Sequence, residues 1–449
     1  MTTKAWMRSG VLAAVLGLLG VPAHGATLAV EDAVKIALER STQIINANAN
    51  IQDAKGGVYG GYGGIIPTLS LSYTRQVSHT DNFVGADYIN GRPIPQPPFG
   101  GRSNSTSPTV SMSWGILDLS NWAGLSAAKE GLHASQLSRN ATRSDVALAT
   151  RRQFYAVVQA VKLAEVSEGA LKLARDDERR VKAMFEVGSV SKSDLLKAQV
   201  RTAQSELDQL TSRHAVTVQR VSLASLMGIM ESEMGEVDTL LVATEQSYDE
   251  AALLAEAGKN RPDLIAAQAD LKSAKAAFNA ARMARLPYLT AGGQFTLDFR
   301  DKTTNFPLGY DKIQFGNTYD QRFGAQLALH WDVFNLSAID TRIASARARV
   351  DRNQEAYDAL HRNLQSEVHQ QLLAYSEATE GNRVAQRGLE SATENLKLTQ
   401  EKYNVGSATI LDLIDAQVQL QTAQSNVVKA LAAIRVGEAQ INRVRGRPE

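Results

Sequence analysis

The chain has 449 residues, of which 44% are hydrophobic and 21% are charged, and it contains no cysteine. The 48 basic residues nearly balance the 47 acidic ones, so the sequence lacks the positive excess expected of a protein that binds nucleic acid. Without cysteine there are no disulfides, thiol nucleophiles, Cys-ligated metal centres or acylated N-terminal cysteine, and we expect no lipid anchor.

The first 25 residues have the pattern of a secretory signal peptide. Lys4 and Arg8 form a positive start, an apolar run covers residues 11–21, and a small-residue cleavage site precedes Ala26. We therefore expect export.

No later segment approaches 18 uninterrupted apolar residues, so the sequence predicts no transmembrane helix. Any part of the chain that enters a membrane must therefore do so as strands.

The rest of the chain is an internal duplication, recognised from three blocks that recur in the same order. Residues 33–69 match 253–289, Trp114–Ser120 match Trp331–Ser337, and Phe185–Leu195 match Tyr403–Leu413. The sequence predicts a first repeat over 26–240 and a second over 241–449. In each repeat we expect a helix, a strand after a proline, a polar loop, a second strand, a very long helix, a glycine turn and another long helix.

Four segments alternate apolar and polar residues, as strands with one apolar face do. The apolar positions are Leu69, Leu71 and Tyr73; Val110, Met112 and Trp114; Phe295, Leu297 and Phe299; and Leu327, Leu329 and Trp331. An antiparallel sheet packed on helices explains this alternation as well as a membrane-spanning sheet does. The segments at about 77–108 and 300–322 are rich in Gly, Pro, Asn and Ser, so we expect long loops there, as on the outer face of an outer-membrane barrel.

The longest predicted helix runs from Leu119 to Val187 without a proline, and it would extend for about 100 Å at ~1.5 Å per residue. The last helix carries two apolar positions in every seven residues, which is the pattern of a coiled coil. They are Leu413, Leu420, Val427, Ile434 and Ile441, with Ala416, Ala423, Ala430, Gly437 and Val444. A simple dimeric coiled coil is the alternative interpretation of this pattern.

Each pair of long helices is joined at a glycine, Gly188 or Gly406, that suits the left-handed end of a helix. Asp194 and Asp412 follow at the third position of the next helix, where an acid can serve only to cap the helix. Asp415 is not required for capping. It lies three residues after Asp412, on the same helix face.

The sequence offers no pattern for catalysis or for metal binding. Its seven histidines form no HExxH or i,i+4 pair, and no Gly-x-Ser-x-Gly motif is present. The run Gly56–Gly64 lacks the GxxxxGK[ST] and GxGxxG patterns, and we interpret it as a flexible transition from helix to strand. We expect no enzyme activity, no metal and no cofactor.

The mature chain, about residues 27 to 446, resembles the TolC-type outer-membrane efflux proteins. The resemblance rests on three duplicated motifs: Leu/Ile-Pro-x-Leu at Ile66 and Leu286, Trp-x-Ile/Val-Leu/Phe-Asp/Asn at Trp114 and Trp331, and Val-Gly-Ser at Gly188 and Gly406. It implies a mixed fold, with a long α-helical coiled-coil tunnel in the periplasm and four transmembrane β-strands per chain in a shared 12-stranded barrel. A homotrimer is also expected on physical grounds, because single-chain barrels begin at about eight strands.

The resemblance also implies roles for particular residues. Asp412 and Asp415 would form the periplasmic gate, as two rings of carboxylates at the trimer axis. Some family members carry an arginine latch where this chain has Ala408, so the resting latch is open to question. A periplasmic adaptor would dock on Gly188, Ser189, Asp194, Gly406 and Ser407, and Tyr73, Trp114, Phe299 and Trp331 would form aromatic girdles at the lipid interfaces.

We therefore predict an exit duct in the outer membrane of a Gram-negative bacterium. It would serve a tripartite efflux or type I secretion system together with a periplasmic adaptor, an inner-membrane transporter and outer-membrane lipid. The alternative is a soluble periplasmic coiled-coil scaffold or adaptor. The exported substrate cannot be read from the sequence.

Overall fold

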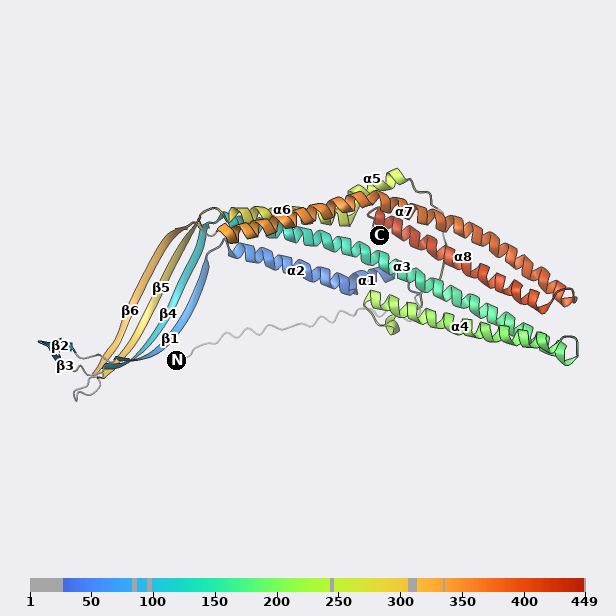
Figure 1. Ribbon diagram of the computed structural model, residues 1–449, viewed down its shortest axis with the longest axis horizontal. Coiled ribbons are helices and arrows are strands. Elements are labelled where there is room, and N and C mark those ends of the chain that lie inside the picture. The colour runs from blue at the N-terminus through green and yellow to red at the C-terminus, as the bar shows by residue number, and fades with distance from the viewer. Residues whose placement is uncertain are drawn as a thin grey trace, which may run out of the picture.

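The computed structural model describes residues 27–82, 87–94, 99–242, 246–305, 313–333 and 336–447. The expected signal peptide lies outside these residues. The molecule is elongated, with a curved sheet at one end and long helices that run from it to two helical turns at the other end (Figure 1). The C-terminal end lies part-way along the helices.

The two predicted repeats have the same succession of elements. The first contains α1 (Val30–Arg40), α2 (Thr42–Gly63), β1 (Thr68–Asn82), a small hairpin of β2 (Asp87–Ile89) and β3 (Arg92–Ile94), β4 (Phe99–Leu117), α3 (Leu119–Glu186) and α4 (Lys192–Met227). After a 3-10 turn, η1 (Glu231–Glu233), the second contains α5 (Glu250–Asn260), α6 (Pro262–Met283), β5 (Tyr288–Asn305), β6 (Ile313–His330), α7 (Leu336–Asn404) and α8 (Ile410–Val444).

The single helix expected at the start of each repeat is in fact two helices. The first break is at Ser41, whose extended backbone ends α1 and whose hydroxyl accepts the Ile44 N–H at the start of α2. The second is at Arg261, where Pro262 begins α6. Proline fits the first position of a helix because the N–H it lacks would have no partner there.

The four long strands form one antiparallel sheet in the order β1-β4-β5-β6, so that its central pair joins the two repeats. The predicted loops at about 77–108 and 300–322 are too long, because β1 continues to Asn82, β4 begins at Phe99, β5 continues to Asn305 and β6 begins at Ile313. Backbone hydrogen bonds between strands hold these ends, although their content of Gly, Pro, Asn and Ser is typical of loops.

The interpretation of Gly56–Gly64 as a flexible transition is wrong. Helix α2 continues through this run to Gly63 and packs against α3, with a close approach at Gly61. A Cβ at Gly61 would lie 3.1 Å from Leu125 Cδ1, and the Gly64 carbonyl accepts a hydrogen bond from Asn121 Nδ2 at 2.8 Å. Gly61 and Gly64 therefore pack against α3, whereas a Cβ at Gly56, Gly57, Gly60 or Gly63 would meet nothing within 4 Å.

Helix α3 has 68 residues, which is about 102 Å at ~1.5 Å per residue and confirms the predicted rod. The coiled-coil positions of α8 are largely buried: Leu413, Ile434 and Ile441 are at most 1% exposed.

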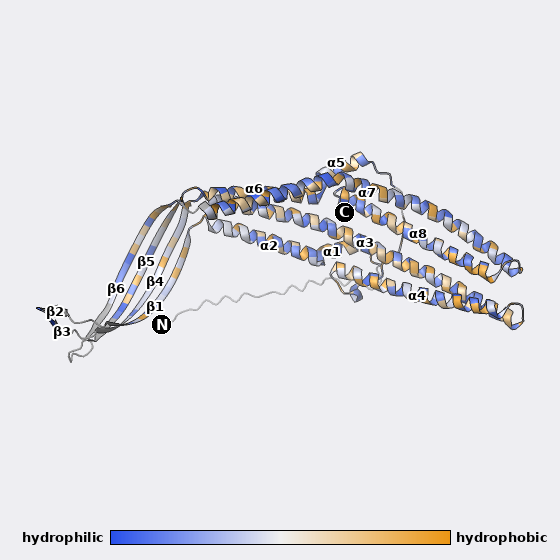
Figure 2. Ribbon diagram, in the orientation of Figure 1, coloured by the Kyte–Doolittle hydropathy of each residue, from blue (hydrophilic) through white to orange (hydrophobic). Residues whose placement is uncertain are grey.

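Hydrophobic and hydrophilic residues are interspersed along the strands and the helices (Figure 2). Among the helices of the described residues, none is both long enough and apolar enough to cross a membrane.

An ion network around the buried Arg261 side chain joins the helices near the middle of the molecule. The Arg261 guanidinium is buried and donates to Asp263 and Glu367, each at 2.6 Å. Arg443 near the end of α8 donates to the same Glu367 and to Asp145 on α3, both at 2.9 Å. Since Ser41 stands at the matching position of the first repeat, the central arginine of this network has no counterpart in the described residues of that repeat.

Helix α4 ends at Gly228, and a matched pair of variants tests how closely this end is packed. Gly228 has a φ of 70°, and a Cβ there would lie 2.4 Å from the Arg40 carbonyl oxygen. Gly188 has a φ of 76°, but a Cβ there meets nothing within 4 Å. Both substitutions to alanine place a side chain in the left-handed region, at a cost of roughly 1–2 kcal/mol.

Gly188→Ala should lower the thermal midpoint slightly, whereas Gly228→Ala should lower it much further, because the Arg40 backbone must also move. Circular dichroism melts of the protein in detergent measure both. Equal midpoints for the two variants would contradict the close contact at Gly228.

Candidate functional site

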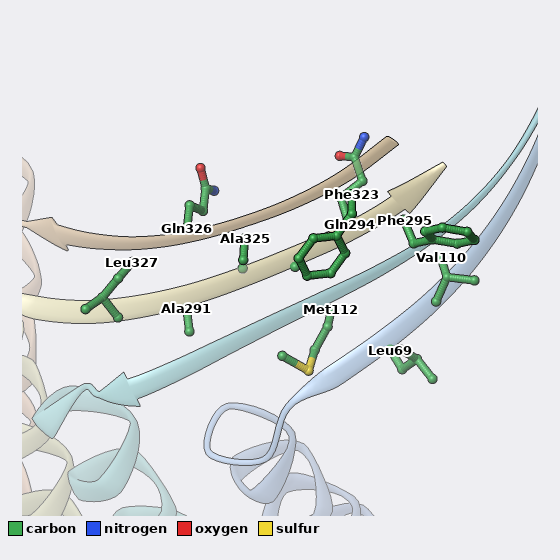
Figure 3. Close-up of a pocket in the computed structure, with 12 residues that line it drawn as sticks. Leu69, Val110, Met112, Ala291, Gln294, Phe295, Phe323, Ala325, Gln326 and Leu327 are labelled. Carbon is green, nitrogen blue, oxygen red and sulfur yellow. The ribbon is translucent and has the colours of Figure 1, made fainter. Parts of the chain in front are cut away.

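One face of the sheet is apolar and uncovered. The register places Leu71, Val110, Phe295 and Phe323 in one row across the four strands. Leu71 is 77% exposed and Phe323 is 79% exposed in the single chain. A shallow hollow of about 610 Å³ on the sheet is lined by Leu69, Met112 and Leu327 among others, and Figure 3 shows the neighbours Gln326 and Leu327 pointing to opposite sides of β6.

The opposite face of the sheet is polar and internally hydrogen-bonded. Hydroxyl groups pair across the strands, as in Ser70 with Ser111 at 2.7 Å and Thr109 with Thr296 at 3.1 Å. Asp298 accepts a hydrogen bond from Ser107 at 3.1 Å and forms ion pairs with Arg300 and Arg322. A sheet with one lipophilic and one hydrated face suits a wall between hydrocarbon and a water-filled lumen.

The apolar face has the height of a membrane. It covers the eleven residues of β5 from Leu289 to Phe299, and the ten intervals between them span about 33 Å at ~3.3 Å each, or about 25 Å for strands tilted by ~40°. Phe299 contacts Tyr319 at its outer end, with 5.2 Å between ring centroids. The sequence reasoning missed Tyr319 because it lies in the segment that we expected to be a loop, although its alternation with Phe323 could have revealed it.

The four aromatic residues predicted for the girdles occupy both ends of this face. The Trp114 indole N–H donates to the Ile65 carbonyl at 2.8 Å, and Trp331 follows the last residue of β6. Both therefore lie at the helix end of the sheet. Tyr73 and Phe299 lie further along the strands, with Tyr73 opposite Pro108 and Phe299 opposite Thr106.

The two glycine turns lie together at the far end of the helices (Figure 1). Gly188 and Gly406 have φ values of 76° and 77°, in the region that favours glycine. After each one the serine N–H donates back to the helix, from Ser189 to the Met184 carbonyl at 2.8 Å and from Ser407 to the Lys402 carbonyl at 2.9 Å. The two turns thus have the same geometry, and both present exposed serines.

The acids after these turns have different partners. Asp412 completes a capping box, because its carboxylate accepts the N–H and the hydroxyl of Thr409, and these bonds lower its pKa. Asp194 accepts from the Ser191 hydroxyl and from Lys197 at 3.2 Å, which lowers its pKa too. Asp415 is exposed and accepts from Gln419 at 2.7 Å. Asp412 therefore has a structural role in capping α8, whereas Asp415 takes no part in capping.

The two helical hairpins, α3 with α4 and α7 with α8, pack against each other just beneath the turns. An apolar cluster takes one or more residues from each of α3, α4, α7 and α8: Val181, Ala198, Tyr403, Ile410 and Leu413. Beside it the Gln417 side-chain amide donates to the buried carboxylate of Asp177, whose pKa is raised by burial. Sequence reasoning missed Asp177, since an acid on a long helix carries no signal of what packs against it.

No group of three or more metal-ligating side chains occurs within the described part of the chain. The molecule instead has a two-faced sheet joined to long helical hairpins with acidic tips. This is the architecture of a conduit.

Comparison with known sequences agrees with this architecture. The sequence profile of the family described as "Outer membrane efflux protein" matches residues 33–229 and 253–447, once for each repeat. The chain belongs to the outer membrane efflux protein family. Its membership confirms the resemblance and the duplication that were inferred from the motifs.

The chain is 23% identical over 343 residues to nodulation protein T of Rhizobium leguminosarum bv. trifolii, covering 73% of this chain and 69% of that protein. It is 20% identical to outer membrane protein TolC of Escherichia coli, covering 77% and 70%. The CmeC outer membrane channel of Campylobacter jejuni superposes with a TM-score of 0.76 at 17% identity, over 93% of this chain and 86% of that one.

As a member of the outer membrane efflux protein family, the protein is an exit duct for efflux in the outer membrane. The apolar sheet face accounts for this location, and the scaffold alternative is not favoured. Members of the family are channels, which agrees with the expectation that the chain is not an enzyme.

Adjacent residues of β1 test which face meets lipid. Leu71→Arg should remove most of the protein from the outer membrane fraction, because an arginine near the middle of the lipid face costs about 2–4 kcal/mol. Ser72→Arg, on the polar face of the same strand, should insert normally. Immunoblots of sucrose-gradient membrane fractions measure both. Equal loss from the two variants would reject the assignment of faces.

Proposed function

We propose that three copies of this chain form one duct, with twelve strands closed into a barrel and the helices extended into a periplasmic tunnel. The observation that carries the proposal is the four-stranded sheet, which has an exposed apolar face and two open edges, β1 and β6. Edge N–H and C=O groups are not tolerated in hydrocarbon, so the sheet must be completed by other chains. Trp114, Trp331, Tyr73 and Phe299 then form the girdles.

Asp412 and Asp415 form the gate at the periplasmic end of this duct. They lie on the first two turns of α8, on one helix face, beside the apolar cluster beneath the tips. Around a threefold axis they form two rings of carboxylates, which attract cations and restrict a narrow aperture. Ala408 stands where some family members carry the latch, and the apolar cluster, the Asp177–Gln417 hydrogen bond and the hydrogen bond from Arg201 to Gln421 at 2.9 Å join the hairpins of each chain.

The turns themselves dock a periplasmic adaptor, which links the duct to an inner-membrane transporter of an efflux or type I secretion system. Gly188, Ser189, Gly406 and Ser407 lie at the tips, and a side chain added at either glycine meets nothing within 4 Å in the single chain. The equal geometry of the turns offers six similar docking positions around a trimer.

Charge and size at the gate are separable by mutation. Replacing both Asp412 and Asp415 by alanine should raise single-channel conductance in planar bilayers and weaken block by divalent cations. Asp415→Asn keeps the size and removes the charge, so it should weaken the block with little change in conductance. Asp194→Asn, which removes an acid paired with Lys197 outside the gate, is the control and should leave both properties unchanged.

If the double alanine variant kept the conductance and the block of the unchanged protein, the constriction would lie elsewhere in the duct. Because Asp412 completes the capping box of α8, its alanine variant is also expected to weaken the helix start. A melt of each variant shows whether that loss affects the folded state.

Docking at the tips is tested with added bulk. Ser189→Trp or Ser407→Trp should abolish efflux in cells that lack their own outer-membrane channel, measured as intracellular accumulation of a compound that the unchanged protein exports there, while the variant still reaches the outer membrane. Lys172→Trp, an exposed position on α3 further from the tip, is the control and should support efflux. Full efflux with both serine variants would refute adaptor docking at these turns.

A further inference from the structure

A polar contact lies in the seam between the two hairpins of one chain. Helix α3 packs on α8, and Gln417 on α8 donates its amide N–H to the carboxylate of Asp177 on α3. Asp177 is 8% exposed and Gln417 is 6% exposed. Burial raises the pKa of Asp177, and the hydrogen bond partly offsets this rise. This seam therefore contains a buried acid–amide pair.

The internal duplication supplies a second pair at the same height. The counterparts of Asp177 and Gln417, 218 residues away, are Asn395 on α7 and Gln199 on α4. All four residues are eleven positions from the glycine of their own turn (177 to 188, 188 to 199, 395 to 406, 406 to 417). They lie about 16 Å from the tips at ~1.5 Å per residue.

Within one chain this second pair is not assembled. The helices lie in the order α7, α8, α3, α4, so that α7 and α4 are the outer two (Figure 1). Asn395 and Gln199 are both exposed. The same two helices carry uncovered apolar residues: Val200 and Leu207 on α4, 70% and 56% exposed, and Val384 and Leu398 on α7, 57% and 46% exposed.

We infer that the seam between neighbouring copies repeats the seam within a chain, and that Asn395 of one copy accepts a hydrogen bond from the Gln199 amide of the next. The inference rests on the proposed trimer. Asn395 Nδ2 already donates to Gln419 Oε1 at 3.3 Å, which leaves Asn395 Oδ1 as the acceptor. The contact joins two different surfaces of the chain. Successive copies therefore form a closed ring only if the rotation from one copy to the next brings the last copy into contact with the first.

The sheet has the same arrangement. Its central pair, β4 with β5, joins the two repeats within a chain, and the counterparts of these strands, β6 and β1, are the two edges. The same rotation from one copy to the next therefore pairs the open edges of the sheets and forms the helical seam between the copies. At this level the seam within a chain holds an ionisable acid, whereas the seam between copies holds two neutral amides.

The natural chain has no cysteine, so paired cysteines test the contact directly. The Asn395→Cys/Gln199→Cys variant in isolated outer membranes, treated with a short bis-maleimide, should give mainly a three-chain band on a denaturing gel. Asp177→Cys/Gln417→Cys should react within one chain and stay at the mass of one chain. Asn395→Cys/Glu206→Cys moves one cysteine two turns along the same face of α4, about 10 Å, and should react poorly.

The native mass in mild detergent separates the two possible failures. A mass of three chains with no band from the Asn395–Gln199 pair, or with an equal band from the Glu206 control, would overturn the inferred pairing and leave the trimer intact. A native mass of one chain without cross-linking would overturn the trimer as well.

Discussion

The open hydrogen-bonding edges of the sheet are the constraint on which the rest of the molecule depends. An unpaired backbone N–H or C=O costs several kcal/mol in hydrocarbon, so a sheet with edges at β1 and β6 cannot stand alone there. Since the strands continue into α3 and α7, whatever closes the sheet also sets the positions of the helices. Closing the barrel therefore also determines how the helices of the tunnel are arranged.

Closure also explains the many apolar residues that the single chain leaves uncovered. Those on the sheet, such as Leu71 and Phe323, form one face that suits lipid, whereas those on α4 and α7, such as Val200 and Leu398, lie on the outer helices of the four. A duct wall has a lipid side only over its sheet. In the proposed trimer, the helical residues are covered by contact with further copies of the chain.

At the tips, one acid of the proposed gate, Asp412, also stabilises the fold. Asp412 is fixed by the Thr409 capping box, which places it at the start of α8 and favours its charged form. Asp415 projects from the same face one turn later. A local helix-capping rule thus positions the first carboxylate, and the helix repeat positions the second, without any further device in the described residues.

The sequence by itself determined the duplication, the four strands, the long helices and the glycine turns, because each depends on local periodicity or on the backbone freedom of one residue. Only the tertiary structure decided the ends of the strands, the helical conformation of Gly56–Gly63 and the burial of Asp177. Partners distant in the chain supply the physical reason: cross-strand hydrogen bonds, the approach of α2 to α3, and the packing of α3 on α8.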